Sequence, residues 1–506
     1  MSSYAASITS NANSLAGYTK KVARPARPDI EIDLKDHTEG RVYTTYDALS
    51  GNVKITAPQN ARFDEVKITL EGTIRTYVDN LSPAASASTK TTAIHRFLKL
   101  VMPVSESEYP QPRIAESGRT YTFPYNFVIP DRLLPRSCTH PNTADHVTEA
   151  HLQLPPSMGH RALIGGQSDM APEMSKVLYA IRVQVVKRRE EDAREVVLVE
   201  RNMPIRVIPA QAEAAPLIVG AEDDQFVLSK TKALKKGMFS GKLGKVTVSA
   251  AQPAAIILPA PSSSSSTPAT TMATVQLRFD PHDSSAQPPR LGGLSTKITA
   301  STFFAVRPTS GIPTHRNAQS AFEIHRGVYD STVSVSSRCV ESVQWTKHPA
   351  TIRRGSASST SSSDFSDCSQ PIVPKESAAY YSAKILVPIT LPSTKVWIPT
   401  FHNCITSRLY VLDLSLSIHT PGAGVPASTV ALHLPLQIGA AGNLSSRPEM
   451  TAAEAAAELA EVDEFLRPRL IEMPREELIG NSVLAHHATD LPPSYEFSGV
   501  AQAIRS

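Results

Sequence analysis

The sequence predicts an all-β protein: two antiparallel β-sandwiches in tandem, with disordered Ser/Pro-rich insertions and a C-terminal tail that holds one short helix. The first observation is a period-two alternation of apolar and polar residues, which is typical of strands with one face in water. The second is that no long amphipathic helix pattern precedes residue 450, which argues against a parallel α/β sheet. The third is the presence of 40 prolines in 506 residues together with Ser-rich blocks, which indicate folded units separated by unstructured stretches.

The first sandwich is expected over residues 28–212, after a disordered arm at residues 1–27. In its clearest strand, Val66, Ile68 and Leu70 alternate with polar neighbours. A further strand leads into a charged turn at residues 187–194. The strands expected in this half are Ile30–Leu34, Val53–Ile55, Val66–Ile74 and Tyr179–Val185.

The second sandwich is expected over residues 213–440, with the junction near residues 209–222. Apolar residues recur at every second position from Tyr410 to Ile418, and the same pattern follows soon after. The strands expected in this half are Val275–Phe279, Val333–Val335, Tyr410–Ile418 and Val430–Ile438.

Several segments interrupt these patterns. Residues 80–92 and 259–271 are rich in small polar residues and proline, and are expected to be loops or insertions, whereas the low-complexity segment at about 353–370 is expected to be disordered. In the tail, residues 441–506, Thr451 and Glu454 form a capping box that predicts a helix over 452–466.

Composition argues against several classes of function. A net charge of +4 on a chain this long, with no basic stripe interleaved with aromatic residues, predicts no nucleic-acid binding. Cysteines occur at widely separated positions with no C-x-x-C pair, so we expect neither a disulfide framework nor a zinc site. They are Cys138, Cys339, Cys368 and Cys404.

The location expected from the sequence is cytoplasmic. The N-terminal residues lack a basic segment followed by an apolar one, and no stretch approaches 18 consecutive apolar residues, the length that a membrane-spanning helix needs. We therefore expect a chain that is neither secreted by the usual route nor membrane-spanning.

Residues 145–151 (DHVTEAH) raise the question of a metal site. The spacing of His146, Glu149 and His151 matches neither H-E-x-x-H nor H-x-x-E-H, and such motifs need a helix, so we interpret the segment as a loop near a turn. No Gly-rich phosphate loop or nucleophile elbow is present either. The sequence therefore predicts no catalytic residue, no metal, no cofactor and no enzymatic activity.

The tail contains a candidate partner-binding motif, LPPSY, at residues 491–495. Pro492 and Pro493 fix the backbone close to polyproline II, so Leu491 to Tyr495 needs little ordering on binding. WW domains recognise this geometry through an aromatic-lined groove, with Tyr495 entering a neighbouring pocket. A motif this short also arises by chance, so the rest of the chain must show whether it is a binding site.

A basic block lies between Phe226 and Val246, and the 55 residues between Asp224 and Asp280 contain no acidic residue. One interpretation is a patch that faces anionic cytoplasmic lipid or a phosphorylated cargo tail, and the other is a solvated connection. One of its lysines could also accept regulatory ubiquitin. The candidate lysines are Lys230, Lys232, Lys235 and Lys236.

The Ser-rich insertion offers candidate phosphorylation sites. Two arginines precede Ser356, which suits a basophilic kinase, and Ser363 and Ser366 are each followed by aspartate. Phosphate on these residues would add about −1.5 to −2 charges per site and could create a partner site. The alternative, with equal support from the sequence, is a Ser-rich linker that is not phosphorylated.

Four stretches resemble a known family. YTFPYNFVIPDRLLPRSC (121–138) and HLQLPPSMG (151–159) are similar to the N-terminal domain of fungal arrestin-like proteins. PPRLGGLSTKITASTFF (288–304) and VWIPTFHNCITSRLYVLDLSLSI (396–418) are similar to their C-terminal arrestin domain. The resemblance spans most of residues 28–440 and points to the arrestin-related trafficking adaptors, or alpha-arrestins, whose members typically carry P-P-x-Y motifs outside the sandwiches. Relatives often have two or more such motifs, whereas this chain has one.

The resemblance implies an adaptor with two arrestin-type sandwiches. Its body would bind the cytoplasmic tail of a membrane transporter or receptor, and its tail would recruit a Nedd4-type HECT ubiquitin ligase through WW domains. Cargo would then be ubiquitinated and internalised, with the adaptor recruited peripherally to plasma membrane and endosomes. The alternative is a ligase-independent arrestin-fold scaffold in receptor signalling or endosomal sorting.

Overall fold

The computed structural model describes residues 28–443 except for 81–88, 190–191, 193, 220–224, 238–240, 262–267, 319–323, 353–375, 378 and 421–425. Both groups of strands fall within one compact unit of the chain. The expectations for the arm at 1–27, the insertion at 353–370 and the helix at 452–466 all lie outside the described residues.

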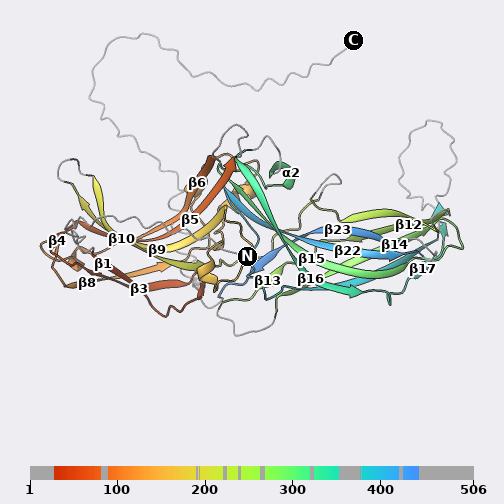
Figure 1. The fold of residues 1–506 in the computed structure, drawn as a ribbon, viewed down its shortest axis with the longest axis horizontal. Coiled ribbons are helices and arrows are strands. Elements are labelled where there is room, and N and C mark those ends of the chain that lie inside the picture. The colour runs from red at the N-terminus through yellow and green to blue at the C-terminus, as the bar shows by residue number, and fades with distance from the viewer. Residues whose placement is uncertain are drawn as a thin grey trace, which may run out of the picture. The chain divides into compact units, whose positions relative to one another are not determined.

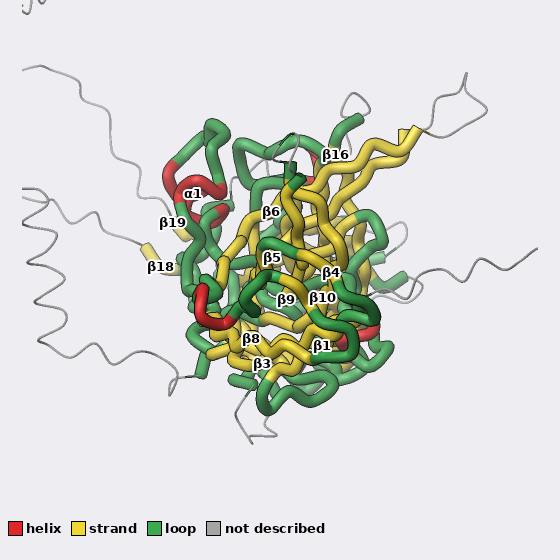
Figure 2. Tube along the Cα trace, turned by 90° about the vertical axis from the view of Figure 1, so that its left-hand side faces the viewer, coloured by secondary structure: helices red, strands yellow, loops and turns green. Residues whose placement is uncertain are grey.

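The first half of the chain forms two facing sheets, as the end view in Figure 2 shows. One sheet has the strand order β1-β3-β8, the other has β2-β10-β9-β5-β6, and β4 and β7 form a separate pair. The strands are β1 (Asp29–Leu34), β2 (Val42–Tyr43), β3 (Ala48–Thr56), β4 (Ala61–Arg62), β5 (Glu65–Asn80), β6 (Thr89–Met102), β7 (Ile114–Ala115), β8 (Thr120–Val128), β9 (Ser175–Arg188) and β10 (Glu195–Val207).

The second half repeats this architecture (Figure 1). Its sheets have the orders β11-β12-β14-β20-β17 and β16-β15-β22-β21, β23 also pairs with β22, and β13–β24 and β18–β19 are small pairs. The strands are β11 (Ser229–Lys235), β12 (Lys242–Ala250), β13 (Ile256–Leu258), β14 (Thr270–Pro281), β15 (Arg290–Ala305), β16 (Arg326–Cys339), β17 (Thr346–His348), β18 (Thr351–Ile352), β19 (Glu376–Ser377), β20 (Tyr380–Thr390), β21 (Phe401–His402), β22 (Thr406–His419), β23 (Ser428–Leu436) and β24 (Ile438–Ala440).

Helices in the described part of the chain are short. They are α1 (Asp145–His151), α2 (His315–Ala318) and the 3-10 turns η1 (Glu106–Glu108), η2 (Pro135–Ser137) and η3 (Arg161–Ile164). Pairing between the described strands is antiparallel except for β2–β10 and β13–β24. The all-β, tandem-sandwich prediction is therefore confirmed.

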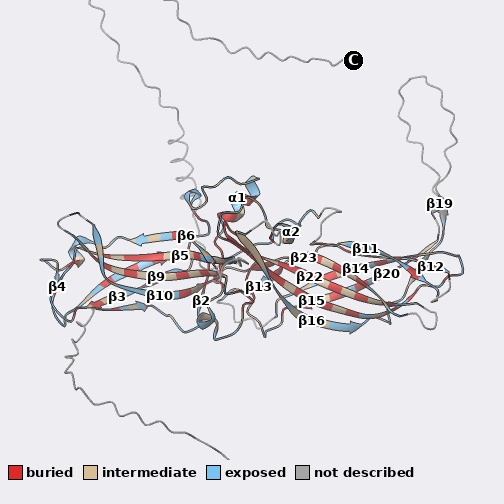
Figure 3. Cartoon of the chain, turned by 45° about the horizontal axis from the view of Figure 1, so that its top comes forward, coloured by how far each residue is buried: buried red, intermediate tan, exposed pale blue. Residues whose placement is uncertain are grey.

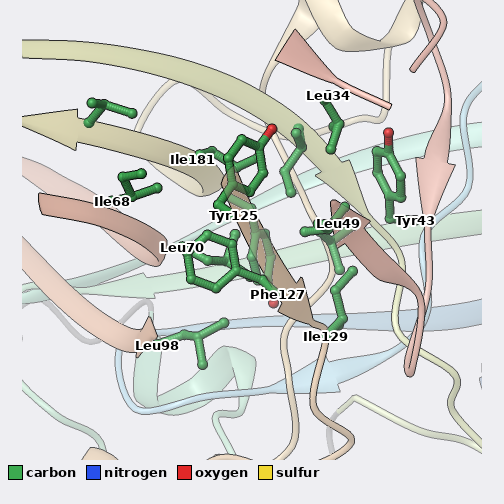
Figure 4. Close-up of a cluster of buried hydrophobic side chains, with 14 of the residues drawn as sticks. Leu34, Tyr43, Leu49, Ile68, Leu70, Leu98, Tyr125, Phe127, Ile129 and Ile181 are labelled. Atoms are coloured by element: carbon green, nitrogen blue, oxygen red, sulfur yellow. The ribbon is translucent and has the colours of Figure 1, made fainter. Parts of the chain in front are cut away.

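Each half has its own apolar core, and both follow from the period-two pattern. In Figure 3 buried positions alternate with less buried ones along the long strands. Ile68, Leu70 and Ile74 of β5 are fully buried against the facing sheet, and Figure 4 shows Ile68 and Leu70 beside Tyr125 and Phe127 of β8. Full burial stabilises each such side chain by about 1.5–3 kcal/mol. In the second core, the apolar positions of β22 from Tyr410 to Ile418 are buried in the same way.

The loops are shorter than the sequence indicated. β5 runs to Asn80 and β6 begins at Thr89, so the last part of the loop expected at 80–92 is strand. Similarly, β14 begins at Thr270, inside the loop expected at 259–271. Polar Ser, Thr and Lys residues continue these strands because one face of each strand is open to water.

Candidate functional site at the junction of the two sandwiches

The motif residues expected to bind partners fall outside the described part of the chain. This applies to Leu491, Pro492, Pro493 and Tyr495, and to the serines 356, 363 and 366. Lys230, Lys232, Lys235 and Lys236 are described, and they lie on or next to the edge strand β11.

The lysines of the basic block are divided between the two faces of this edge. Cross-strand partners in an antiparallel pair share a face. Lys230 and Lys232 pair with Val248 and Val246, which are buried, so these two lysines lie at the rim of the core-facing side. Lys245 pairs with Ala233 on the opposite face. These lysines lie close together in sequence but therefore do not form one continuous array.

Two of the four candidate lysines already have partners. Lys236 Nζ lies 2.7 Å from Asp283 Oδ2, and Lys232 Nζ donates to the main-chain oxygen of Thr429 at 3.2 Å. Lys230 and Lys235 are exposed. Solvent screens an exposed ion pair such as Lys236–Asp283, so it does not prevent Lys236 from meeting another anion.

The contact region between the two sandwiches is polar and buried. Ser175 Oγ of the first sandwich lies 2.7 Å from Thr406 Oγ1 of the second, and Thr76 Oγ1 donates to the main-chain oxygen of Ala305 at 2.6 Å. These three hydroxyl side chains are almost fully buried. Because buried hydroxyls need hydrogen-bond partners, such contacts fix how the two surfaces meet.

Arg408 of β22 is the largest fully buried side chain of the described residues. Its Nη1 donates to the main-chain oxygen of Asp169 at 3.1 Å, and its Nη2 lies 3.4 Å from Met158 Sδ. Both partners belong to the first sandwich. A guanidinium from the second sandwich is thus inserted into a loop region of the first, where it binds neutral acceptors.

The segment 145–151 is a helix, which corrects the expectation of a loop. α1 ends at His151, and the main-chain nitrogen of Leu152 caps it by donating to the oxygens of Thr148 and Glu149. Val147 and His151 are buried, so the helix has one inward face. The helix could not be recognised from the sequence because seven residues are too few to show a helical period.

His151 connects the junction to a cluster that sequence spacing did not reveal. Its Nε2 lies 3.0 Å from Nε2 of His402, and Asn403 Nδ2 donates to its main-chain oxygen at 3.3 Å. Its Nδ1 lies 3.5 Å from Cys138 Sγ, which in turn lies 3.4 Å from His140 Nε2. Cys404 Sγ completes a group of four such atoms that all lie within 4.8 Å of one another.

Burial sets the protonation of the two central histidines. Burial and, to a smaller extent, the neighbouring His140 and His95 together lower the pKa of His151 to about 4. Burial also lowers the pKa of His402 to about 3. Both rings are therefore neutral at pH 7, and in the Nε2–Nε2 contact one ring donates its proton while the other accepts it.

A recess of about 590 Å³ in the first sandwich carries several basic side chains. Arg75, Lys90 and Lys176 line it together with His160 and Arg161, and Glu173 and Asp169 are the acidic residues at its wall. Lys90 Nζ lies 3.3 Å from the ring centre of Tyr77. Sequence reasoning missed this recess because its residues come from separate segments of the chain.

Among the described residues, no helix has the length and apolar character that crossing a membrane requires.

Comparison with known proteins supports the fold. Residues 29–203 match the family model described as arrestin (or S-antigen), N-terminal domain. No curated protein sequence matches the chain. The match covers the strands from β1 almost to the end of β10, and the second half has the same two-sheet architecture. The chain is therefore an arrestin-fold protein whose first sandwich carries an arrestin N-terminal domain.

Proposed function

We propose that the chain is a cytosolic arrestin-like adaptor of the alpha-arrestin type. It recruits a Nedd4-type HECT ubiquitin ligase through Pro492, Pro493 and Tyr495 to plasma-membrane transporters or receptors, and so promotes their ubiquitination and endocytosis. The ligase supplies the chemistry, so the adaptor acts by positioning cargo and needs no catalytic group, metal or cofactor for this role.

The observation that carries the proposal is the combination of an arrestin fold with a P-P-x-Y motif beyond the last described strand, β24. A motif in a polar, proline-containing tail is accessible to a partner domain, whereas one inside a strand would be paired. The tail therefore supplies the ligase contact, and the sandwiches supply the surface for cargo.

The basic recess lined by Arg75, Lys90 and Lys176 supports cargo binding by the first sandwich. Cytoplasmic tails that are acidic or phosphorylated would find convergent cations there, and charge-assisted hydrogen bonds to such groups are stronger than neutral ones. Phosphorylation of Ser356, Ser363 or Ser366 in the insertion would add a second, regulatory partner site on this adaptor.

The test of the proposal uses peptides that span residues 486–500 and the isolated WW domains of a Nedd4-type ligase. A single contact of this kind should bind in the micromolar range, about −7 to −8 kcal/mol. Pro493→Ala should weaken binding because it loosens the preformed polyproline II backbone, whereas Ser494→Ala should be tolerated because the spacer side chain faces away from the groove. Isothermal calorimetry measures both, and equal affinities for the two variants would contradict the assigned binding mode.

The second candidate function is a ligase-independent arrestin-fold scaffold in receptor signalling or endosomal sorting. It is favoured by the single P-P-x-Y motif, because one motif gains no avidity from a ligase with several WW domains. The two candidates differ in whether the tail motif is needed for cargo internalisation.

Peripheral recruitment to anionic membrane is expected to depend on the basic block. Changing Lys230, Lys232, Lys235 and Lys236 together to Ser should weaken binding to phosphatidylserine vesicles, since each lysine near the surface contributes about 1 kcal/mol. Higher salt should have a similar effect on the wild-type chain. Vesicle co-sedimentation measures both, and Lys384→Ser on the outer face of β20 provides a control. If neither the substitutions nor the added salt changes the amount of chain bound to the vesicles, this role is contradicted.

A further inference from the structure

We propose that Cys138, His140, His151 and Cys404 bind one Zn²⁺ in a tetrahedral site that connects the two sandwiches. Two thiolates and two imidazoles form a common ligand set of structural zinc sites. This site is independent of the tail motif and of cargo binding, and it revises the expectation from cysteine spacing that the chain has no zinc site.

The distances between the ligand atoms fit this geometry. Zinc binds sulfur at about 2.3 Å and nitrogen at about 2.0–2.1 Å, so tetrahedral ligands lie about 3.3–3.8 Å apart. Cys138 Sγ lies 3.4 Å from His140 Nε2 and 3.5 Å from His151 Nδ1. With Cys404 Sγ, all four atoms lie within 4.8 Å of one another, so only small side-chain adjustments would complete the site.

The neighbouring groups orient the ligands. If His151 binds the metal through Nδ1, its Nε2 carries the proton and donates to His402 Nε2, 3.0 Å away. His402 then carries its own proton on Nδ1, 2.5 Å from Ser407 Oγ. Hydrogen bonds of this kind fix the tautomer and orientation of metal-binding histidines.

The two outer ligands have similar support. His140 turns Nδ1 toward the main-chain oxygen of Pro141 at 3.4 Å, which leaves Nε2 for the metal. Asn142 Nδ2 donates to Cys138 Sγ at 3.4 Å, a contact that would stabilise a thiolate. The polar groups around the cluster are thus already arranged for metal-bound ligands.

Charge balance also favours a dication. His151 and Cys404 are almost fully buried, so an unbalanced charge at this site would be costly. Binding Zn²⁺ to two cysteine thiols and two neutral imidazoles releases two thiol protons and leaves a site with no net charge. A neutral site avoids the cost of an uncompensated buried charge.

The four ligands come from both sandwiches, so the metal would connect them. Cys138 follows the turn η2 and His151 ends α1, both in the first sandwich, whereas Cys404 lies in the tight turn between β21 and β22 of the second. That turn is held by the hydrogen bond from Asn403 N to Thr406 O at 2.9 Å. Zinc would therefore fix the junction across a long separation in sequence, as a cross-link does.

The test uses the full chain, purified without a histidine tag, under reducing conditions and with zinc in the growth medium. Elemental analysis should find about one zinc per chain, and the cobalt-substituted protein should show thiolate-to-cobalt absorption. Cys404→Ser should abolish both, whereas Cys339→Ser, an exposed cysteine of β16, should leave both unchanged. A chelator should lower the unfolding midpoint of the wild type and of Cys339→Ser but not that of Cys404→Ser, because metal binding is linked to folding.

Two further variants keep the test valid if Cys404→Ser does not fold. His140→Ala at the partly exposed rim should weaken zinc affinity by more than about 100-fold, and Asn142→Ala by about 10-fold, since changes around the ligands alone cost 10–100-fold. A wild-type chain with neither zinc nor the cobalt band would overturn the proposal. A Cys138–Cys404 disulfide in freshly purified protein, or equal zinc loss in Cys339→Ser, would overturn it as well.

Discussion

Tyr495→Ala is expected to remove the ligase from the full-length chain and to leave cargo unmodified at the membrane. The tyrosine is the anchor of the motif, and truncating an anchor of this kind costs at least about 2 kcal/mol, a loss in affinity of about 30-fold. From a micromolar starting point, this takes the complex out of the range that a pull-down detects. Ligase capture and cargo ubiquitination measure the effect.

The sandwiches should not respond to this change. Residue 495 lies well beyond β24, the last described strand, so the variant should unfold at the wild-type temperature. Ser494→Ala is the matched control, with ligase capture and cargo internalisation unchanged. If Tyr495→Ala still captures the ligase and internalises cargo, the ligase-independent scaffold becomes the better explanation. Zinc content is expected to be the same in both variants, so this test is separate from the one for the junction site.

The fold could be predicted because its strands bury one face each. Leu412, Leu414 and Leu416 alternate with polar residues along β22, and the structure buries them in the second core. A period of two over such a length has few alternative explanations. The ends of the strands were less predictable. Thr89 and Thr270 belong to strands, although the composition of the sequence around them predicts loops.

The junction could not be predicted, because its residues come together only through the pairing of the sheets. Cys138 and Cys404 show no motif spacing, and their proximity depends on how β21 and β22 meet the first sandwich. Arg408 is similar, since its neighbours in sequence, Ser407 and Leu409, give no sign that a charged residue will be buried there. A local pattern reports which face of a strand is apolar, but it does not report what a distant segment brings to the end of that strand.

Arg408→Glu is expected to destabilise the chain by about 3–5 kcal/mol, the cost of leaving a buried charge without a partner. The guanidinium is fully buried and donates to the main-chain oxygen of Asp169, and it also lies against Met158 Sδ. A carboxylate in its place would face the oxygen of Asp169 and the sulfur of Met158, which are both acceptors, so repulsion would be added to desolvation. Arg408→Met keeps the packed stem and removes the charge, so it should lose only the smaller cost of an unsatisfied oxygen, about 1–3 kcal/mol.

Urea unfolding of the full chain measures this series, with Arg338→Glu as the control. Arg338 is exposed on β16, and a change at such a surface position should stay within about 0.5 kcal/mol. Since Arg408 joins β22 to a loop of the first sandwich, Arg408→Glu should also speed proteolysis between the sandwiches, around residues 209–228. If the Met variant were less stable than the Glu variant, the site of Arg408 would tolerate a carboxylate. The junction would then be held by the hydroxyl contacts of Ser175 and Thr76 instead.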